Sequence, residues 1–408
     1  MSVRRFQSAA IGVEGLIQIW NSKHLNKAEI FYLLGLFLYE VSSILGISLL
    51  AESNTVVPKA VTLLKYSAFA LVIIKIIMIS YDGATALSCS ALIMVGMITA
   101  QYSFDSKILD LAIMVVGARK VDFNKICKVL YTTAVAVGCI VVLSSLLGFV
   151  DNATVVSVTE SGATRIRRSF GFASQNGLGA TCLAVCSSYV LSHREKQPFG
   201  RALAFAGVAL VLLLVVDTRT AAYSILIMDA MWLLIHRVNS RVALHASLIV
   251  CLLCVFAGVF LPFAYEDKGL FQVIDGWLSG RLSCASWFLG SHDIPPFGQE
   301  IHFLSTQDAA ALGLTASVLD NAYIHLLLHY GVLSLIAIVA VYGLLVRRAF
   351  SSKDALMCSM VALICVLGML ETWLFMPSIS VLLMATYADF PRGQISNGNV
   401  GHPNAADD

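Results

Sequence analysis

The sequence predicts an all-α fold, a polytopic bundle of about twelve transmembrane helices. Its 408 residues are 58% hydrophobic and only 13% charged, whereas a soluble domain is about 45–50% apolar and about 25% charged. Many apolar runs approach the roughly 20 helical residues needed to cross about 30 Å of hydrocarbon. Because backbone groups in lipid must pair within their own segment, these runs are expected to be helices.

The apolar runs define the expected spans in chain order. We place them at 29–50, 60–80, 84–101, 106–118, 127–149, 174–192, 202–217, 219–236, 243–264, 321–346, 355–371 and 374–389. The fourth span is short, and the last two form either two spans or one broken unit. The sequence lacks the regular alternation of apolar and polar residues that is typical of outer-membrane barrels.

Lysine and arginine clusters orient the bundle. They lie before the first span and after the fourth, sixth, eighth and tenth spans. The clusters comprise Arg4, Arg5, Lys23 and Lys27; Arg119, Lys120, Lys125 and Lys128; Arg194, Lys196 and Arg201; Arg237 and Arg241; and Arg347, Arg348 and Lys353. Every cluster therefore falls on one side, which the positive-inside rule identifies as the cytoplasm. The other side receives two long extracytoplasmic loops, at about 150–173 and 265–320.

The rest of the chain adds no second domain, so residues 1–408 are expected to form a single integral membrane domain. The first 27 residues contain no small-residue cleavage site, and no removable signal peptide is expected. The tail at 391–408 is polar and is expected to be disordered. No basic tract indicates a nucleic-acid partner. Cys251 and Cys254 have no second pair to complete a zinc site, so no metal is expected.

Arginine is concentrated in the outer loops, where the positive-inside rule disfavours it. Arg165, Arg167 and Arg168 lead into a Phe-Gly-Phe turn and the start of a helix. Guanidinium groups bind phosphate bidentately, and a helix N-terminus favours an anion. Contact with anionic lipid head groups explains these arginines equally well. Arg219, between two spans, either binds phosphate or pairs with the aspartate before it, and Arg281 lies in the longer loop.

Polar residues recur where the tenth span begins. Asp320 is expected to cap this helix. Asn321, His325 and His329 follow at intervals of four and therefore share one helix face. A polar stripe on an apolar helix should face the bundle interior or a wet cavity, because exposing it to lipid is costly.

Single charged residues inside other apolar segments form a further group. A charge at the centre of a membrane helix costs about 2.5–3.5 kcal/mol on insertion scales. Glu40, Asp229 and Glu371 are therefore candidates for function, although hydrogen bonding between helices explains them as well. Lys65 and Lys75 are expected to extend their amines to the two membrane interfaces.

Several of these segments, in their order along the chain, resemble the Wzy-type polysaccharide polymerases of the O-antigen polymerase and ligase superfamily. The resemblance covers most of the chain. It is carried by Gly117-Ala-Arg-Lys-Val-Asp-Phe123, Arg168-Ser-Phe-Gly-Phe172 with Gln175-Asn176, Asp217-Thr-Arg219, Ser279-Gly-Arg281, Pro296-Phe-Gly298 and Asp320-Asn-Ala-Tyr323.

This resemblance implies a metal-independent, GT-C-like glycosyltransferase without a cofactor. Such an enzyme lies in the bacterial cell membrane, which is the inner membrane where there are two. At the outer face it moves a growing glycan from undecaprenyl pyrophosphate onto a lipid-linked oligosaccharide repeat unit. The bilayer and this lipid-linked oligosaccharide are the implied partners, together with a flippase and a chain-length regulator.

The resemblance also assigns roles to residues, because the leaving group is a diphosphate. Arg219 and Arg281 are assigned to the diphosphate, and Arg165 and Arg168 to the diphosphate or the glycan. Asp320 is the first candidate for general base or acceptor positioning, and His325 is the second. Further options for the base are His292, Glu300 and His302, and Asn321 and Tyr323 are assigned to substrate binding.

Two alternatives remain open at the level of sequence. An O-antigen ligase-type transferase would attach finished glycan to another acceptor, but related ligases commonly have histidine where this chain has Asp320. A transporter or flippase of lipid-linked oligosaccharide would also have many spans and interior charges. Transporters usually show internal repeats and broken helices, and this sequence shows no repeat.

Overall fold

Helices form nearly all the regular structure of the computed structural model, which describes residues 27–51, 56–152, 154–158, 164–194, 199–235, 237–304 and 318–390. Within these residues, seven helical segments are long and apolar enough to cross a membrane. They are α2 (Lys27–Gly46), α3 (Val56–Met78), α4 (Gly83–Ser103), α6 (Phe123–Leu146), α8 with η1 (Phe199–Val211 and Leu212–Val216), α10 (Ser240–Phe263) and α15 (Val332–Ser351). The chain is thus an all-α, multi-pass membrane protein, as expected. The count of seven is lower than the expected twelve.

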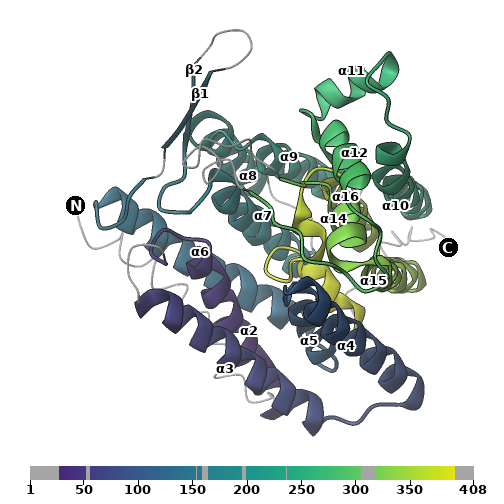
Figure 1. The fold of residues 1–408 in the computed structure, drawn as a ribbon. Helices are drawn as coiled ribbons and strands as arrows, with labels where there is room; N and C mark the ends of the chain where they lie inside the picture. The colour runs from purple at the N-terminus through teal and green to yellow at the C-terminus, as the bar shows by residue number, and fades with distance from the viewer. Residues whose placement is uncertain are drawn as a thin grey trace, which may run out of the picture.

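Four shorter or more polar helices complete the bundle. They are α5 (Lys107–Gly117), α7 (Gln175–Ser192), α9 (Arg219–Leu234) and α16 (Ala355–Gly368). Helix α7 packs between α6 and α9, and α16 packs against α10 and α15 (Figure 1). These helices lie at four of the expected spans, but their length or polarity differs from that of a complete apolar span.

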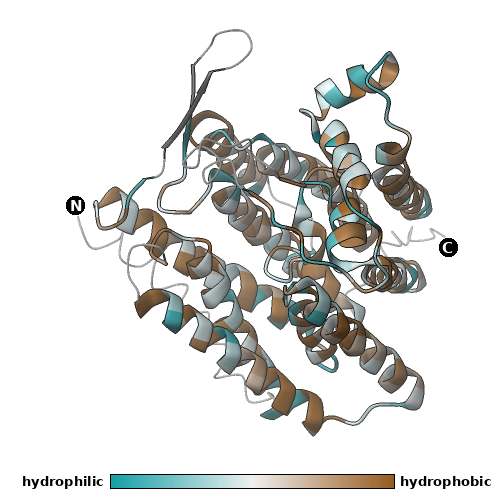
Figure 2. Ribbon diagram, viewed as in Figure 1, coloured by the Kyte–Doolittle hydropathy of each residue, from teal (hydrophilic) through white to brown (hydrophobic). Residues whose placement is uncertain are grey.

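The surface of the bundle is apolar, as lipid contact requires. Figure 2 shows hydrophobic residues along most of the helices. Large apolar side chains such as Leu63, Ile77, Leu203, Phe256 and Phe260 are exposed on α3, α8 and α10. Contiguous apolar surface on this scale is rare in soluble proteins and indicates a membrane environment.

Segments that the positive-inside rule assigned to the cytoplasm contact one another at one face of the bundle. Arg119 pairs with Asp82 at 2.6 Å, and Lys125 pairs with Glu29 at 3.1 Å. A second set of contacts links Arg194 to Asp354 and places the guanidinium groups of Arg194 and Arg348 over the Phe390 ring. Contacts between loops so distant in sequence agree with the expectation that the basic clusters share one face.

The two lysines expected to reach the membrane interfaces instead have partners inside the protein. Lys65 pairs with Asp110 at 2.6 Å. Lys75 is buried, and its amine donates to the carbonyl oxygens of Gly117 and Arg119, where α5 ends. Free carbonyls at a helix C-terminus attract a cation, so this contact joins α3 to α5.

The expected span at 321–346 is interrupted. It consists of α14 (Ala322–His325), the π-helical turn η2 (Leu326–Tyr330) and then α15. Gly331 separates them with φ of +88°, and a Cβ atom there would lie only 2.4 Å from the Gly298 nitrogen. The carbonyls of Pro295 and Pro296 accept from the first N–H groups of α15. The outer loop therefore crosses the chain at this break and caps the next helix.

The expected last span, 374–389, is not an α-helix. It contains two 3₁₀ turns, η3 (Thr372–Phe375) and η4 (Val381–Thr386). Pro377 lies between them and lacks the N–H that a helix would use, which accounts for the interruption. The segment nevertheless crosses the bundle, because Asp389 exchanges backbone hydrogen bonds with Val121 and Phe123 on the opposite face.

The outer loops contain regular structure that the sequence analysis treated as loop. Strands β1 (Thr154–Val158) and β2 (Thr164–Arg168) form an antiparallel hairpin that pairs Thr154 with Arg168. The longer loop contains α11 (Leu270–Trp277) and α12 (Arg281–Ser291). The hairpin and α11 project from the same end of the bundle, at the top of Figure 1. The expectations for the N-terminal 26 residues, for 305–317 and for the 391–408 tail lie outside the described residues.

The break at Gly331 gives a test of the fold. Gly331→Ala should lower the free energy of unfolding by at least about 2 kcal/mol, because the new methyl group meets backbone at a positive φ. Thermal unfolding in detergent measures the change. Gly343→Ala is the matched control, because nothing lies within 4 Å of a Cβ at that position in α15. Equal melting temperatures for the two variants would contradict the close packing of the 295–298 segment on Gly331.

Candidate functional site

A single arginine links two carboxylates at the end of the bundle that the basic clusters predict to be extracytoplasmic. Arg281 Nε donates to Asp320 Oδ2 at 3.1 Å, and its Nη2 donates to Glu371 Oε1 at 3.0 Å. The three residues come from α12, from the segment before α14 and from the segment after α16. Two of the five guanidinium N–H groups are used in these bonds. The remaining N–H groups are donors that an anionic ligand could share.

The position of Arg281 depends on a well-capped helix start. Ser279 and Gly280 both have positive φ and turn the chain sharply before α12. The buried carboxylate of Asp275 then accepts from the N–H groups of Leu282 at 2.8 Å and Ser283 at 3.1 Å. These bonds satisfy N–H groups that a helix start leaves free, and they fix the direction in which Arg281 leaves the helix.

Asn321, rather than the expected Asp320, caps α14. Its Oδ1 accepts from the backbone of Tyr323 and Ile324, and its Nδ2 donates to the Gly258 carbonyl in α10. With the capping role filled by the amide, the carboxylate of Asp320 is left to pair with Arg281. Its side chain is 32% exposed, so a ligand can reach it.

Glu371 is the most buried member of this group. It follows α16, its side chain is 6% exposed, and it accepts from the Thr220 hydroxyl as well as from Arg281. Burial raises the pKa of Glu371 to about 7, with a further contribution from Asp320, while Arg281 and Thr220 oppose the rise. A proton on Glu371 near neutral pH would leave Arg281 less neutralised.

A second charged group adjoins the first at the start of α9. Asp217 lies between Arg167 of β2, at 3.7 Å, and Arg219, at 3.8 Å. Asp217 has φ of +62°, which ends η1 and turns the chain into α9. Because Thr220 follows Arg219 directly and bonds to Glu371, the start of α9 links the Asp217 group to the Arg281 group.

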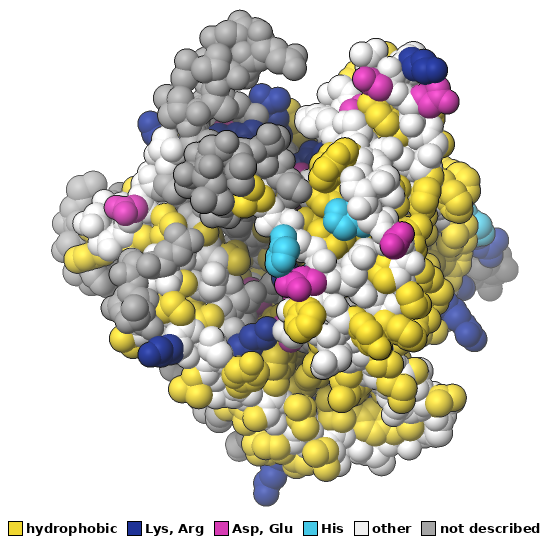
Figure 3. Space-filling model, in the orientation of Figure 1, with side chains coloured by type: hydrophobic (Ala, Val, Ile, Leu, Met, Phe, Trp, Pro, Cys, Tyr) yellow, Lys and Arg dark blue, Asp and Glu magenta, His cyan; other side chains and the backbone are white. Residues whose placement is uncertain are grey.

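The site lies at an uneven part of the surface. Figure 3 shows a hollow between the part that carries the hairpin and the part that carries α11 and α12, with acidic and basic side chains along it. The Arg219 side chain is 64% exposed. Arg168 is exposed at the end of β2, and the side chain of Arg165 lies outside the described atoms.

Other predicted residues lie deeper in the protein. His325 is buried, stacks on the Phe303 ring at 4.6 Å between centroids, and has Nδ1 3.3 Å from the Leu319 carbonyl. Tyr323 is buried, and its hydroxyl donates to the Cys365 carbonyl. The roles predicted for these two residues and for Asn321 stay predictions, but their polar atoms contact protein groups rather than the hollow.

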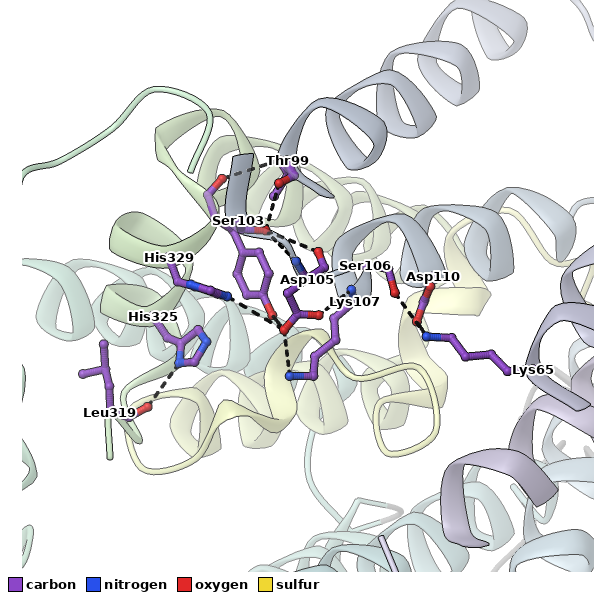
Figure 4. Close-up of polar contacts among 11 residues, drawn as sticks. Lys65, Thr99, Ser103, Asp105, Ser106, Lys107, Asp110, Leu319, His325 and His329 are labelled. Atoms are coloured by element: carbon purple, nitrogen blue, oxygen red, sulfur yellow. Dashed lines mark hydrogen bonds and ion pairs between the residues drawn. The ribbon is translucent and has the colours of Figure 1, made fainter. Parts of the chain in front are cut away.

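A polar network that no local sequence pattern indicated surrounds Asp105, between α4 and α5 (Figure 4). Asp105 accepts from the Tyr330 hydroxyl at 2.8 Å and from the Lys107 amine at 2.9 Å, and His329 Nε2 lies 3.8 Å away. Burial opposes ionisation, yet His329 and the charge of Lys107 hold the pKa of Asp105 well below its usual range. The spacing of His325 and His329 was a usable signal, since their rings lie 5.4 Å apart.

The residues of the site determine which chemistry it can support. Searches against protein-family models, curated proteins and solved structures found no match for this chain. Among the described side chains, no cluster of histidine, cysteine, aspartate or glutamate is arranged to hold a metal ion. What the site offers is preorganised cationic donors next to carboxyls, an arrangement suited to an anionic group and a proton transfer.

The raised pKa of Glu371 predicts a specific pH dependence of stability. The native state keeps a proton that the unfolded state loses, so the contribution is full below pH 4.5 and is lost as pH rises to about 7. The melting temperature should therefore fall more steeply for the natural protein than for Glu371→Gln between about pH 5 and about pH 7.5. Glu266→Gln, which alters an exposed carboxylate, should keep the natural slope. Identical slopes for Glu371→Gln and the natural protein would contradict the assignment.

Proposed function

We propose that this protein is a glycosyltransferase that polymerises lipid-linked oligosaccharide at the outer face of the bacterial cell membrane. The observation that carries the proposal is the convergence of Arg281, Asp320 and Glu371 from three separate segments, with Arg219 one residue from the Thr220 contact. Of these residues, Arg219, Arg281 and Asp320 belong to motifs that resemble those of Wzy-type polymerases. Their proximity is what a shared substrate site requires.

The chemistry assigns the guanidinium groups to the leaving group. Transfer breaks the bond between the donor sugar's anomeric carbon and the diphosphate oxygen of the polyprenyl carrier. Negative charge grows on the departing diphosphate, and fixed cationic donors in a water-poor site stabilise that charge. Arg281 supplies N–H donors that its two carboxyl partners leave unused, and Arg219, next in sequence to Thr220, supplies an exposed guanidinium.

Asp320 is positioned for the other half of the reaction. A hydroxyl of the acceptor sugar forms the new bond to the anomeric carbon and must lose its proton. The Asp320 carboxylate is partly exposed and is held by Arg281, so it can take that proton while the diphosphate leaves on the arginine side. His325 is the weaker candidate for this role, because its ring is enclosed by Phe303, His329 and Phe375.

A transporter of lipid-linked oligosaccharide is the second candidate, and one observation favours it. Two segments are interrupted within the bundle, at Gly331 and around Pro377. Broken helices near the membrane midplane often line the substrate path of a transporter. In this protein, however, the charged groups brought together from separate segments lie at the outer end, which favours an outer-face enzyme.

Chain-length analysis tests the polymerase directly. Arg281→Lys should reduce long-chain glycan at least about 100-fold, because an ammonium cannot reproduce the forked contacts to two carboxyls and a diphosphate. The measurement is gel separation of glycan from a deletion strain that expresses each variant at equal membrane levels. Arg237→Lys, on the opposite face, should leave chain length unchanged.

The glycan that accumulates in the Arg281→Lys strain distinguishes among the candidate functions. Single repeat units exposed on the outer leaflet, without polymer, are the result expected for Arg281→Lys. Lipid-linked polymer that fails to reach its final acceptor would indicate a ligase, and repeat units retained on the inner leaflet would indicate a transporter. Normal chain length in Arg281→Lys would reject the site.

A further inference from the structure

A cavity whose lining does not include Arg281 lies among the helices. It has a volume of about 190 Å³ and is enclosed by α2, α5, α7 and the non-helical segment at 376–379. Polar side chains in its lining are those of Tyr39, Glu40, Ser43, Lys107, Thr181 and Ser378. At a share of about 30 Å³ for each water molecule, this space would hold about six waters or one ring-sized polar molecule.

Glu40 is the residue in this lining that most needs a ligand. It is 2% exposed, it lies within the apolar helix α2, and its Oε2 has no hydrogen-bond partner. A buried carboxyl oxygen without a donor loses its hydrogen bonds to water and gains none from the protein. This lowers the stability of the fold by about 1–3 kcal/mol or more. A bound molecule that donates hydrogen bonds to Glu40 would remove this cost.

Lys107 provides donors on another side of the cavity. Its amine bonds to Asp105, but it has three N–H groups, and its side chain is 49% exposed. Lys107 and Glu40 both line the cavity, but Lys107 forms its ion pair with Asp105. A ligand between them would therefore need both donors and acceptors, which an ion of one charge lacks.

The walls of the cavity continue into the outer site. The segment that carries Pro377 and Ser378 follows Glu371 within a few residues. On α7, Gly179 packs so closely on Thr218, beside Arg219, that a Cβ would lie 2.8 Å from its side chain. Asp105, the partner of Lys107, bonds to Tyr330 on the helical segment that begins just after Asp320. The elements that line the cavity thus contact the elements that carry the site.

We propose that this cavity binds a neutral sugar ring, namely a sugar of the acceptor repeat unit. This identity of the ligand rests on the proposed glycosyltransferase function, although the need of Glu40 for a donor does not. A sugar presents hydroxyls that both donate and accept, which matches Glu40 and Lys107. It also presents C–H faces, which match the apolar parts of the lining, Ile44, Met376 and Pro377.

Binding by the purified protein in detergent tests the proposal without an activity assay. The probes are methyl glycosides of glucose, galactose and N-acetylglucosamine, and the oligosaccharide released by mild acid from the host's lipid-linked repeat units. Saturation-transfer NMR should detect the oligosaccharide on the natural protein. Glu40→Gln should weaken that binding at least about tenfold, because the amide replaces a carboxyl oxygen with a nitrogen that cannot accept a hydrogen bond. Thr181→Leu, which fills the cavity, should abolish it.

Stability supplies a second measurement for the same variants. If Glu40 is kept for a ligand, Glu40→Gln should raise the melting temperature of the ligand-free protein, since a buried carboxyl oxygen that lacks a donor is removed. Glu266→Gln, which changes an exposed carboxylate, should alter neither binding nor melting. A lower melting temperature with unchanged binding in Glu40→Gln would assign Glu40 to the fold and overturn the proposal, as would the absence of binding by every probe.

Arg281→Lys separates this proposal from the polymerase. Arg281 is not part of the cavity lining, so this variant should bind the oligosaccharide as the natural protein does. Binding only of the simple glycosides, and not of the repeat-unit oligosaccharide, would contradict an acceptor role. If chain length is normal in Arg281→Lys while Glu40→Gln loses sugar binding, the cavity stands and the polymerase fails.

Discussion

The outer end of this protein depends on one arginine shared by two carboxyls. Arg281 joins three segments that are distant in sequence, and Glu371 is almost fully enclosed at that junction. Burying charged groups is expensive unless they are paired, and removing one partner leaves the others uncompensated. The junction therefore positions the start of α12, the approach to α14 and the end of α16 together, which makes the arrangement of the outer site inseparable from that of the helices below it.

The surrounding membrane explains the arrangement of the remaining polar groups. In hydrocarbon, broken backbone and charged side chains are tolerated only where protein or trapped water satisfies them. The break at Gly331 is filled by the 295–298 segment, and Lys75 donates to carbonyls at the end of α5. Asp105 accepts hydrogen bonds from the buried Tyr330 and from Lys107. Glu40 Oε2 differs from these groups because it has no hydrogen-bond partner, which makes its cavity a candidate ligand-binding site.

Much of the fold was accessible from the sequence, because lipid imposes a simple rule on composition and length. Apolar runs located most helices to within a few residues, and the basic clusters agree with one shared face. The breaks within the expected spans were harder to predict. Gly331 adopts its positive φ where it packs against Phe297, in a loop 34 positions earlier in the chain. The network around Asp105 was missed because a short polar turn between two spans resembles an ordinary connection. The choice of Asn321 over Asp320 as the cap depends on Arg281, which no local pattern includes.

Whether Arg281 binds a diphosphate can be measured directly, because Glu371 competes for the same guanidinium group. The binding of a short-chain polyprenyl diphosphate to purified protein can be compared for the natural chain, Arg281→Ala and Glu371→Gln. If the arginine holds the diphosphate, Arg281→Ala should weaken binding at least about tenfold, while Glu371→Gln should strengthen it because one competing anion is removed. Unchanged affinity in Arg281→Ala, or affinity lost in Glu371→Gln as much as in Arg281→Ala, would contradict a diphosphate site at this junction.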